Sequence, residues 1–301
     1  YNGRMPELPE VETMRRGLEP AVGCRITGVE RAACARKPIT IEPDVTALAR
    51  RTVGTRIERT DRVGKRVVLW LDSGDALVFE PRMTGLVLLA DPPDPLYTRL
   101  RIALSPRRAG RGRNAAPQSS RQPAAPRQIL YWDRRGLGNV RLVTARQFQV
   151  RYGLDVLGPD ALTVTAELYK ERLGRSSRPV TVGLLDQRAV AGIGNLYASE
   201  ILHVAGVAPG RPCCRLTREQ WERIAAATLQ VLELAIRFEG STLSDGTYRN
   251  ALNKAGGYQN QHRVYDKAGA KCPRPGCHGE VARIVQAQRS TFFCPSCQGR
   301  R

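Results

Sequence analysis

Four cysteines near the end of the sequence have the spacing of a metal site. Cys272-x4-Cys277 and Cys294-x2-Cys297 are two close pairs separated by sixteen residues. Two such pairs can place four thiolates around one Zn²⁺, and four protein ligands leave no open position for water. The spacing therefore predicts one structural zinc in a reducing compartment. His278, next to Cys277, is a competing ligand, and four unligated thiols are the alternative.

The segment Met5-Pro6-Glu7 offers a nucleophile beside a carboxyl group. If Met5 is the initiator and is removed, Pro6 has a free secondary amine, and an α-amino pKa of about 8 leaves far more free base at neutral pH than a lysine has. Such an amine attacks an aldehydic carbon to give an iminium, an electron sink for elimination. Glu7 can act as general acid or base if burial raises its pKa.

Four residues precede Met5, and they bear directly on this chemistry. If Tyr1 began the mature chain, the nitrogen of Pro6 would be an amide without a lone pair to offer. We therefore expect residues 1–5 to be a non-native or unprocessed extension.

Two further segments carry groups suited to anions. Gly192 and Gly194 interrupt an apolar helical pattern, and Asn195 opens the next helix, where backbone N–H groups and the positive end of the dipole suit a phosphate. The alternative is a helical hairpin whose glycines only allow close packing. Between the cysteine pairs, residues 280–293 alternate like a two-stranded hairpin, which would present Arg289 near its tip.

The overall charge favours a polyanionic partner. Lys and Arg number 48 against 28 Asp and Glu, for a net charge of +20. Nucleic acid is the first candidate, and a ribosome-like or merely solvated basic surface is the alternative. The sequence has no run of about 18 apolar residues, so we expect no membrane span. It also lacks the apolar segment of a signal peptide. We therefore expect a cytoplasmic protein.

The remaining pattern divides the chain into a β-rich and a helical part. Leu8, Val11, Met14 and Leu18 predict a helix at the start. Short β-rich runs over residues 25–89 predict an antiparallel β domain, interrupted later by a basic insertion, Ser105–Gln128, that we expect to be disordered. Helical patterns broken at glycines follow: TAELYKERL, VGLLDQRAVAGIGNLYASEILHVAGV and TREQWERIAAATLQVLELAIRFEG.

Three stretches together resemble the formamidopyrimidine-DNA glycosylases of the helix-two-turn-helix class. They are MPELPEVETMRRGLEP, LLDQRAVAGIGNLYASEIL and RSTFFCPSC, in the family's order, and the resemblance spans Met5 to Cys297 apart from the insertion. It implies an α+β multidomain fold with an N-terminal helix, an antiparallel β-sandwich, a helix-two-turn-helix domain and a zinc-ribbon-like hairpin finger. It also implies a bifunctional DNA glycosylase and AP lyase for oxidised purines, which acts on duplex DNA through a Schiff base and β,δ-elimination.

The resemblance also assigns roles to individual residues. Pro6 would attack C1′, Glu7 would be the acid/base, and Lys65 would contact phosphate and assist elimination. The full catalytic set that it implies is Pro6, Glu7, Lys65 and Arg289. The residues that it places against substrate or DNA are Glu10, Met83, Arg99, Arg135, Leu137, Asn195 and Tyr258.

The sequence departs from the family pattern at two places. In DRRGLG (133–138), Arg135 would face the orphaned base, but Leu137 stands where an aromatic residue is usual. In LYTRLRI, the usual histidines are absent, and Arg99 is the nearest substitute as a DNA contact. Further along, Gly256-Gly257-Tyr258 would give mobility to the segment that caps the extruded base.

We expect a monomer whose domains are 6–152 (catalytic), 153–263 (helix-two-turn-helix) and 264–301 (zinc finger). An endonuclease VIII-like preference for oxidised pyrimidines is the nearest alternative, although Leu8 and the capping segment argue against it. A damaged-DNA-binding protein without catalysis is the alternative from a different class, and it requires a blocked N-terminus.

Overall fold

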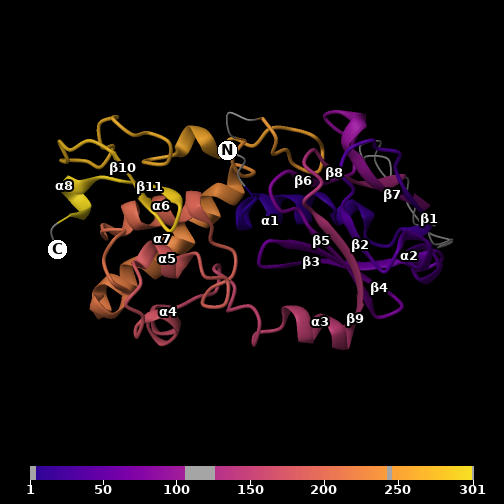
Figure 1. Cartoon of the computed structure of the whole chain (residues 1–301), viewed down its shortest axis with the longest axis horizontal. Coiled ribbons are helices and arrows are strands. Elements are labelled where there is room, and N and C mark those ends of the chain that lie inside the picture. Colours follow the sequence, from indigo (N-terminus) through magenta and orange to yellow (C-terminus); the bar gives the residue numbers. More distant parts are fainter. Residues whose placement is uncertain (1–4, 106–125, 243–245, 300–301) are drawn as a thin grey trace, which may run out of the picture.

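The computed structural model describes residues 5–105, 126–242 and 246–299. A β-rich part and a helical part lie side by side, and the N-terminal helix α1 (Leu8–Gly17) lies where they meet (Figure 1). Residues 1–4 and most of the predicted insertion lie outside the described residues. No helix in these three ranges is both long enough and apolar enough to cross a membrane.

The β-rich part consists of two packed sheets that enclose one apolar core. The first sheet is antiparallel, with the order β1 (Arg25–Arg31), β7 (Thr98–Ser105), β8 (Gln128–Asp133) and β6 (Gly85–Leu88). The second has the order β2 (Thr40–Glu42), β9 (Asn139–Thr144), β5 (Asp75–Glu80), β4 (Arg66–Leu71) and β3 (Ile57–Val63). β7 ends at Ser105 and β8 begins at Gln128, so the predicted insertion connects the two strands of a hairpin, as the sequence indicates.

The β-rich part is not purely antiparallel, which corrects the prediction for residues 25–89. β2 pairs with β9 in parallel, and a helix, α2 (Val45–Thr52), follows it. The side chain of Asp44 accepts the N–H of Ala47 and so caps this helix, which buries Leu48 against the sheets. A helix of two turns has too little periodicity to stand out among strands.

The helical part is built around its longest helix, α7 (Arg218–Arg237), which begins with a capping box between Thr217 and Gln220. α7 packs against α6 (Asn195–Ala205) and α4 (Ala166–Leu173). The other helices of the described chain are α3 (Ala145–Tyr152), α5 (Val180–Leu184), α8 (Pro295–Gln298), η1 (Glu19–Ala21), η2 (Pro95–Tyr97), η3 (Cys213–Arg215) and η4 (Tyr258–Gln261).

The predicted C-terminal hairpin is present and rests on α6. It pairs β10 (Ala282–Gln286) with β11 (Arg289–Phe293), and its turn residues Ala287 and Gln288 have positive φ. The N–H of Phe292 lies 3.5 Å from the hydroxyl of Ser199 on α6. The hairpin therefore packs against α6 (Figure 1).

Helix α1 belongs to both cores. Leu8 is buried in the core of the helical part, whereas Val11, Met14 and Leu18 are buried in the core between the sheets. Beside α1, the guanidinium of Arg62 on β3 bonds Glu12 on α1 at 3.2 Å and Asp160 in the helical part at 2.6 and 2.9 Å. The two parts are therefore joined by shared apolar packing and by a largely buried ion cluster.

We expect the Arg62→Met substitution to lower the free energy of unfolding by about 3 kcal/mol, because removing one member of a buried cluster leaves desolvated charge behind. Urea unfolding at neutral pH measures this loss. The matched control is Arg218→Met, whose partner Glu222 is also exposed, and we expect it to cost less than about 0.5 kcal/mol. Equal effects of the two substitutions would show that the cluster does not hold the parts together.

Candidate active site

A cavity opens where α1, the β5–β6 turn and the segment after α7 meet. Predicted catalytic and DNA-contacting residues line it together with residues that the sequence did not single out. The lining residues are Met5, Pro6, Glu7, Glu10, Met83, Thr84, Gly85, Leu86, Leu196, Ser241, Thr247 and Tyr248.

Glu7 lies at the N-terminal end of α6 and is 8% exposed. Its carboxylate accepts the backbone N–H groups of Leu196, at 3.0 Å, and Tyr197, at 3.4 Å. Burial raises the pKa of Glu7 to about 7, although the nearby charge of Lys65 and the two N–H donors lower it. At neutral pH the carboxyl group is therefore divided between its acid and base forms, which suits proton transfer in either direction.

The glycines of the GIGN stretch explain how Glu7 reaches this position. The carboxyl carbon of Glu7 lies 2.2 Å from the place where a Cβ on Gly194 would be, so any side chain there would displace it. Gly192 has φ +113° and leaves room for Leu8, whose N–H bonds the Gly192 carbonyl at 3.1 Å. Both glycines thus allow the N-terminal segment to dock on the helical part.

This docking corrects one prediction for the GIGN stretch. The sequence predicts that the first N–H groups of α6 suit a phosphate, but those of Leu196 and Tyr197 are donated to Glu7. The side chain of Asn195 donates instead to the Ser290 carbonyl of the finger hairpin at 2.8 Å. Its buried Oδ1 has no partner among the described residues.

Glu10 is a second buried carboxyl group, one helical turn from Glu7. It accepts the backbone N–H of Glu7 at 2.9 Å, the hydroxyl of Tyr197 at 2.6 Å and the N–H of Ser241 at 2.9 Å. Burial raises the pKa of Glu10 and these donors oppose the rise. The site thus includes Tyr197 and Ser241, which sequence reasoning missed. The one signal in the sequence was that Tyr197 lies two residues after Asn195, a predicted site residue.

Lys65 and Arg289 lie near this carboxyl pair. Lys65 occupies the turn between β3 and β4 and is half-buried; burial lowers the pKa of its amine, Glu7 raises it, and Arg289 lowers it further. Arg289 is exposed at the start of β11. The structure therefore brings together all four residues of the predicted catalytic set, Pro6, Glu7, Lys65 and Arg289, from three separate parts of the fold.

Met83 and Arg135 lie on two loops that touch. The guanidinium Nη1 of Arg135 lies 3.2 Å from the Met83 sulfur. Beneath them, the buried carboxylate of Asp133 accepts the Thr84 hydroxyl, the N–H of Arg135 at 3.1 Å and the N–H of Gly138 at 2.8 Å. Leu137 is half-buried in the same loop. Asp133 and Thr84 therefore act as the shared support, which the sequence did not reveal.

The structure contradicts the predicted roles of Arg99 and Tyr258. Arg99 is 3% exposed, and it donates to the Asp133 carbonyl at 2.7 Å and to the Cys34 sulfur at 2.8 Å, so it supports the 133–138 loop from inside and does not face DNA. Tyr258 is fully buried, with its ring centroid 5.7 Å from that of Tyr197. The adjacent Gly257 N–H bonds the Phe238 carbonyl at 2.8 Å.

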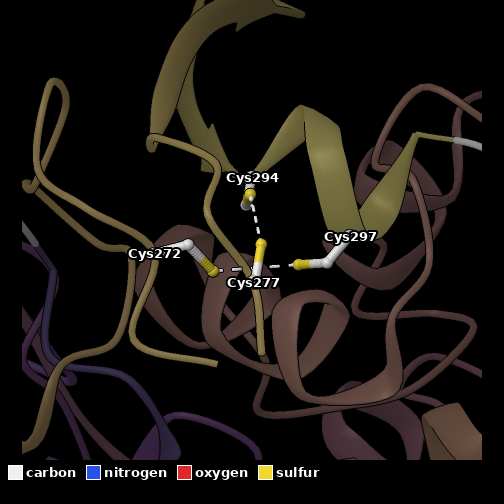
Figure 2. A group of neighbouring side chains, drawn as sticks. All are labelled: Cys272, Cys277, Cys294 and Cys297. Atoms are coloured by element: carbon white, nitrogen blue, oxygen red, sulfur yellow. Dashed lines mark hydrogen bonds between the residues drawn. The ribbon is translucent and has the colours of Figure 1, made fainter. Parts of the chain in front are cut away.

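The four predicted zinc ligands converge at the base of the finger (Figure 2). Their sulfur atoms all lie within 4.8 Å of one another, with Cys272–Cys297 at 3.8 Å and Cys277–Cys294 at 3.7 Å. A tetrahedron with Zn–S bonds of about 2.3 Å has edges of about 3.8 Å, so the thiols fit one structural Zn²⁺.

Two histidines lie near the zinc ligands. His278, the competing ligand, is exposed and is not in the cluster of four sulfurs. The Nε2 of His203 on α6 lies 3.3 Å from the Cys272 sulfur and connects the finger to the helical part. The sequence did not single out His203.

Comparison with known proteins gives the same arrangement of parts. Residues 5–140 match the formamidopyrimidine-DNA glycosylase N-terminal domain, residues 157–247 match the H2TH domain of these glycosylases, and residues 269–299 match the zinc finger found in FPG and IleRS. The formamidopyrimidine-DNA glycosylase of Caulobacter vibrioides (strain NA1000 / CB15N) is 37% identical over 303 residues, which cover 98% of this chain and all of the relative.

Solved structures agree over nearly the whole chain. The MutM (Fpg) protein from Thermus thermophilus is 36% identical with a TM-score of 0.78, and the match covers 98% of this chain and 100% of that one. A Lactococcus lactis Fpg mutant in complex with a Fapy-dG containing DNA has a TM-score of 0.82 at 29% identity and the same coverage. Lactococcus lactis Fpg in complex with an abasic site containing DNA has a TM-score of 0.80 at 29% identity, covering 97% and 99% of the two chains.

We expect the Lys65→Met substitution to raise the pKa of Glu7 further above its present value of about 7, because it removes the cation that stabilises the charged carboxylate. Carbon-13 NMR titration of the glutamate carboxyl groups, with Glu7→Gln to assign the signal, measures the shift. Lys170→Met, on the exposed side of α4, is the matched control and should leave the titration unchanged. A pKa that falls or stays constant in Lys65→Met would contradict the proximity of the two charges.

Proposed function

The chain belongs to the formamidopyrimidine-DNA glycosylase family, and from this premise we propose how its own residues excise oxidised purines. It is a DNA glycosylase of base excision repair, and cleavage of the resulting abasic site is consistent with the family. The observation that carries the proposed mechanism is the buried carboxyl group of Glu7, with a pKa of about 7, next to Pro6 in a cavity bordered by Met83.

In the proposed reaction, the damaged nucleotide is extruded into this cavity and Met83 fills the gap that it leaves. The lone pair of the Pro6 amine attacks C1′, the bond from C1′ to the base breaks, and the proton that Pro6 loses passes to the departing base. Glu7 in its acid form protonates the sugar ring oxygen as the ring opens, leaving an iminium between Pro6 and C1′. Glu10 holds Glu7 in place by accepting its backbone N–H.

The iminium then acts as the electron sink for two eliminations. The Glu7 carboxylate accepts a proton from C2′ as the bond from C3′ to its phosphate oxygen breaks. Loss of a proton from C4′ then breaks the bond from C5′ to its phosphate oxygen, and water hydrolyses the iminium to free Pro6. We assign the phosphates to Lys65 and Arg289, which can stabilise the departing negative charge, and to the side chain of Asn195. The lowered pKa of Lys65 also suits it for proton transfer.

Double-stranded DNA that carries oxidised purines or abasic sites is the proposed substrate. The DNA complexes of the Lactococcus lactis enzyme support this assignment. Because the 133–138 loop carries Leu137, we propose that its stacking against the strand opposite the lesion is weaker than with an aromatic residue.

We further propose a monomer that works on DNA in the bacterial cytoplasm, with domains at 6–152, 153–263 and 264–301 and with one structural zinc. The three matched domains support the division of the chain, and the bacterial relatives support its assignment to a bacterial protein. The mechanism requires residues 1–5 to be removed, since only then is the nitrogen of Pro6 an amine.

We expect borohydride to trap a covalent complex between protein whose mature end is Pro6, verified by mass, and an 8-oxoguanine duplex. The same protein with Met5 retained has an amide at Pro6, which cannot form an iminium, so it should bind the duplex without trapping. Denaturing electrophoresis measures the adduct. Equal trapping by both forms would rule out Pro6 as the nucleophile.

A further inference from the structure

A buried carboxylate outside the catalytic cavity, that of Glu80, collects contacts from several segments. Glu80 ends β5 and is 7% exposed. It accepts Arg66 Nη2 at 2.9 Å and Asn139 Nδ2 at 3.0 Å, and it lies 3.4 Å from both Arg82 Nε and Arg141 Nη1. Few carboxylates are buried unless they are paired, and this one is paired four times.

Three of these partners directly adjoin segments with proposed roles in the reaction. Arg66 follows Lys65, and Arg82 precedes Met83. Asn139 follows the 133–138 loop, which carries Arg135 and Leu137. Glu80 itself belongs to none of these segments and does not line the cavity.

The backbone at Arg82 shows why the contact with Glu80 matters for Met83. Arg82 has φ +54°, in the left-handed region that residues other than glycine rarely adopt. The turn that presents Met83 therefore depends on contacts that hold Arg82 in this conformation. The ion pair with Glu80 is one such contact.

The backbone around Glu80 is also closely packed. The hydroxyl of Tyr131 donates to the Glu80 carbonyl at 3.0 Å. The same hydroxyl lies 2.5 Å from where a Cβ on Gly85 would be and 1.7 Å from where one on Gly138 would be. The Met83 turn and the 133–138 loop therefore both pack against the Tyr131 hydroxyl, which is bonded to Glu80.

Glu80 remains negatively charged at neutral pH. Burial alone would raise the pKa of its carboxyl group, but Arg66, Asn139, Arg82 and Arg141 hold the pKa below its ordinary value. The charge that attracts the three guanidinium groups is thus present under the conditions in which the enzyme works.

From these contacts we propose that Glu80 is a positioning residue. It fixes the catalytic Lys65 relative to Met83, the residue that fills the gap left by the extruded nucleotide. The proposal rests on the roles of Lys65 and Met83 given above. Through Arg66, Glu80 holds the start of β4, next to Lys65 in the β3–β4 turn. Through Arg82, it holds the β5–β6 turn that carries Met83. Substitution of Glu80 should slow the chemical steps more than it weakens DNA binding, because the proposed phosphate contacts Asn195 and Arg289 lie on other elements, α6 and β11.

The test is the Glu80→Gln substitution, assayed with saturating enzyme in a single turnover well below its unfolding temperature. We expect excision of 8-oxoguanine and cleavage of an abasic duplex each to slow by about 10–100-fold, because small displacements of reacting groups cost that much. The dissociation constant for a duplex with a tetrahydrofuran abasic analogue should change less than about threefold. Glu222→Gln, in an exposed ion pair on α7, is the matched control.

Two further variants keep the test decisive. If Glu80→Gln is too unstable, Glu80→Asp retains the charge but is one methylene too short for all four partners, and it should slow both reactions to a smaller extent. Combining Glu80→Gln with Arg82→Gly should restore excision selectively, because glycine adopts the left-handed turn without the ion pair. Abasic cleavage should remain slow in the double variant, because it depends on Lys65 in the β3–β4 turn and the Glu80–Arg66 contact beside that turn is still missing.

The outcomes separate this proposal from the proposed function. Rates within twofold of wild type in both folded Glu80 variants would overturn the positioning role and leave the mechanism intact. A wild-type enzyme with a verified Pro6 end that neither excises nor traps would overturn the mechanism itself.

Discussion

The arrangement of the active site depends on one interaction, the docking of the Glu7 carboxylate on the first N–H groups of α6. This contact joins the N-terminal segment to the helical part and places the carboxyl group next to Pro6. The dipole of α6 favours the charged form and burial favours the neutral form. The pKa of about 7 reflects burial, which raises it, against the charge of Lys65 and the two N–H donors of α6, which lower it.

The surrounding structure supports this contact from both sides. Glu10 is a second buried carboxyl group, and it positions the site by accepting hydrogen bonds from the Glu7 backbone, the Tyr197 hydroxyl and the Ser241 backbone. Burying two acidic groups costs stability. The shared core around α1 and the ion cluster of Arg62 offset that cost at the same junction. The carboxyl groups of the site and the contacts that join the β-rich and helical parts therefore lie at the same junction, around α1.

Local patterns in the sequence predicted much of this protein. The cysteine spacing, the amphipathic α1 and the glycines before Asn195 each reflect a constraint within a few residues. The errors in the site concern side chains whose partners are distant in sequence: Arg99 turns inward to the 133–138 loop, and Tyr258 packs on Tyr197. The donation of the α6 N–H groups to Glu7, about 190 residues away, was missed for the same reason. Long-range pairing needs the fold and cannot be deduced from one sequence.

The Gly194→Ala substitution tests the central role of the Glu7 contact most directly. Gly194 has φ −124° and ψ −167°, which alanine also adopts, and the nearest atoms that a new Cβ would meet are those of the Glu7 carboxyl group, whose carbon lies 2.2 Å away. Single-turnover excision of 8-oxoguanine should slow by about 100-fold. Gly210→Ala, whose Cβ would meet only Gln286 at 3.6 Å, should excise normally. Wild-type excision by folded Gly194→Ala protein would contradict this account.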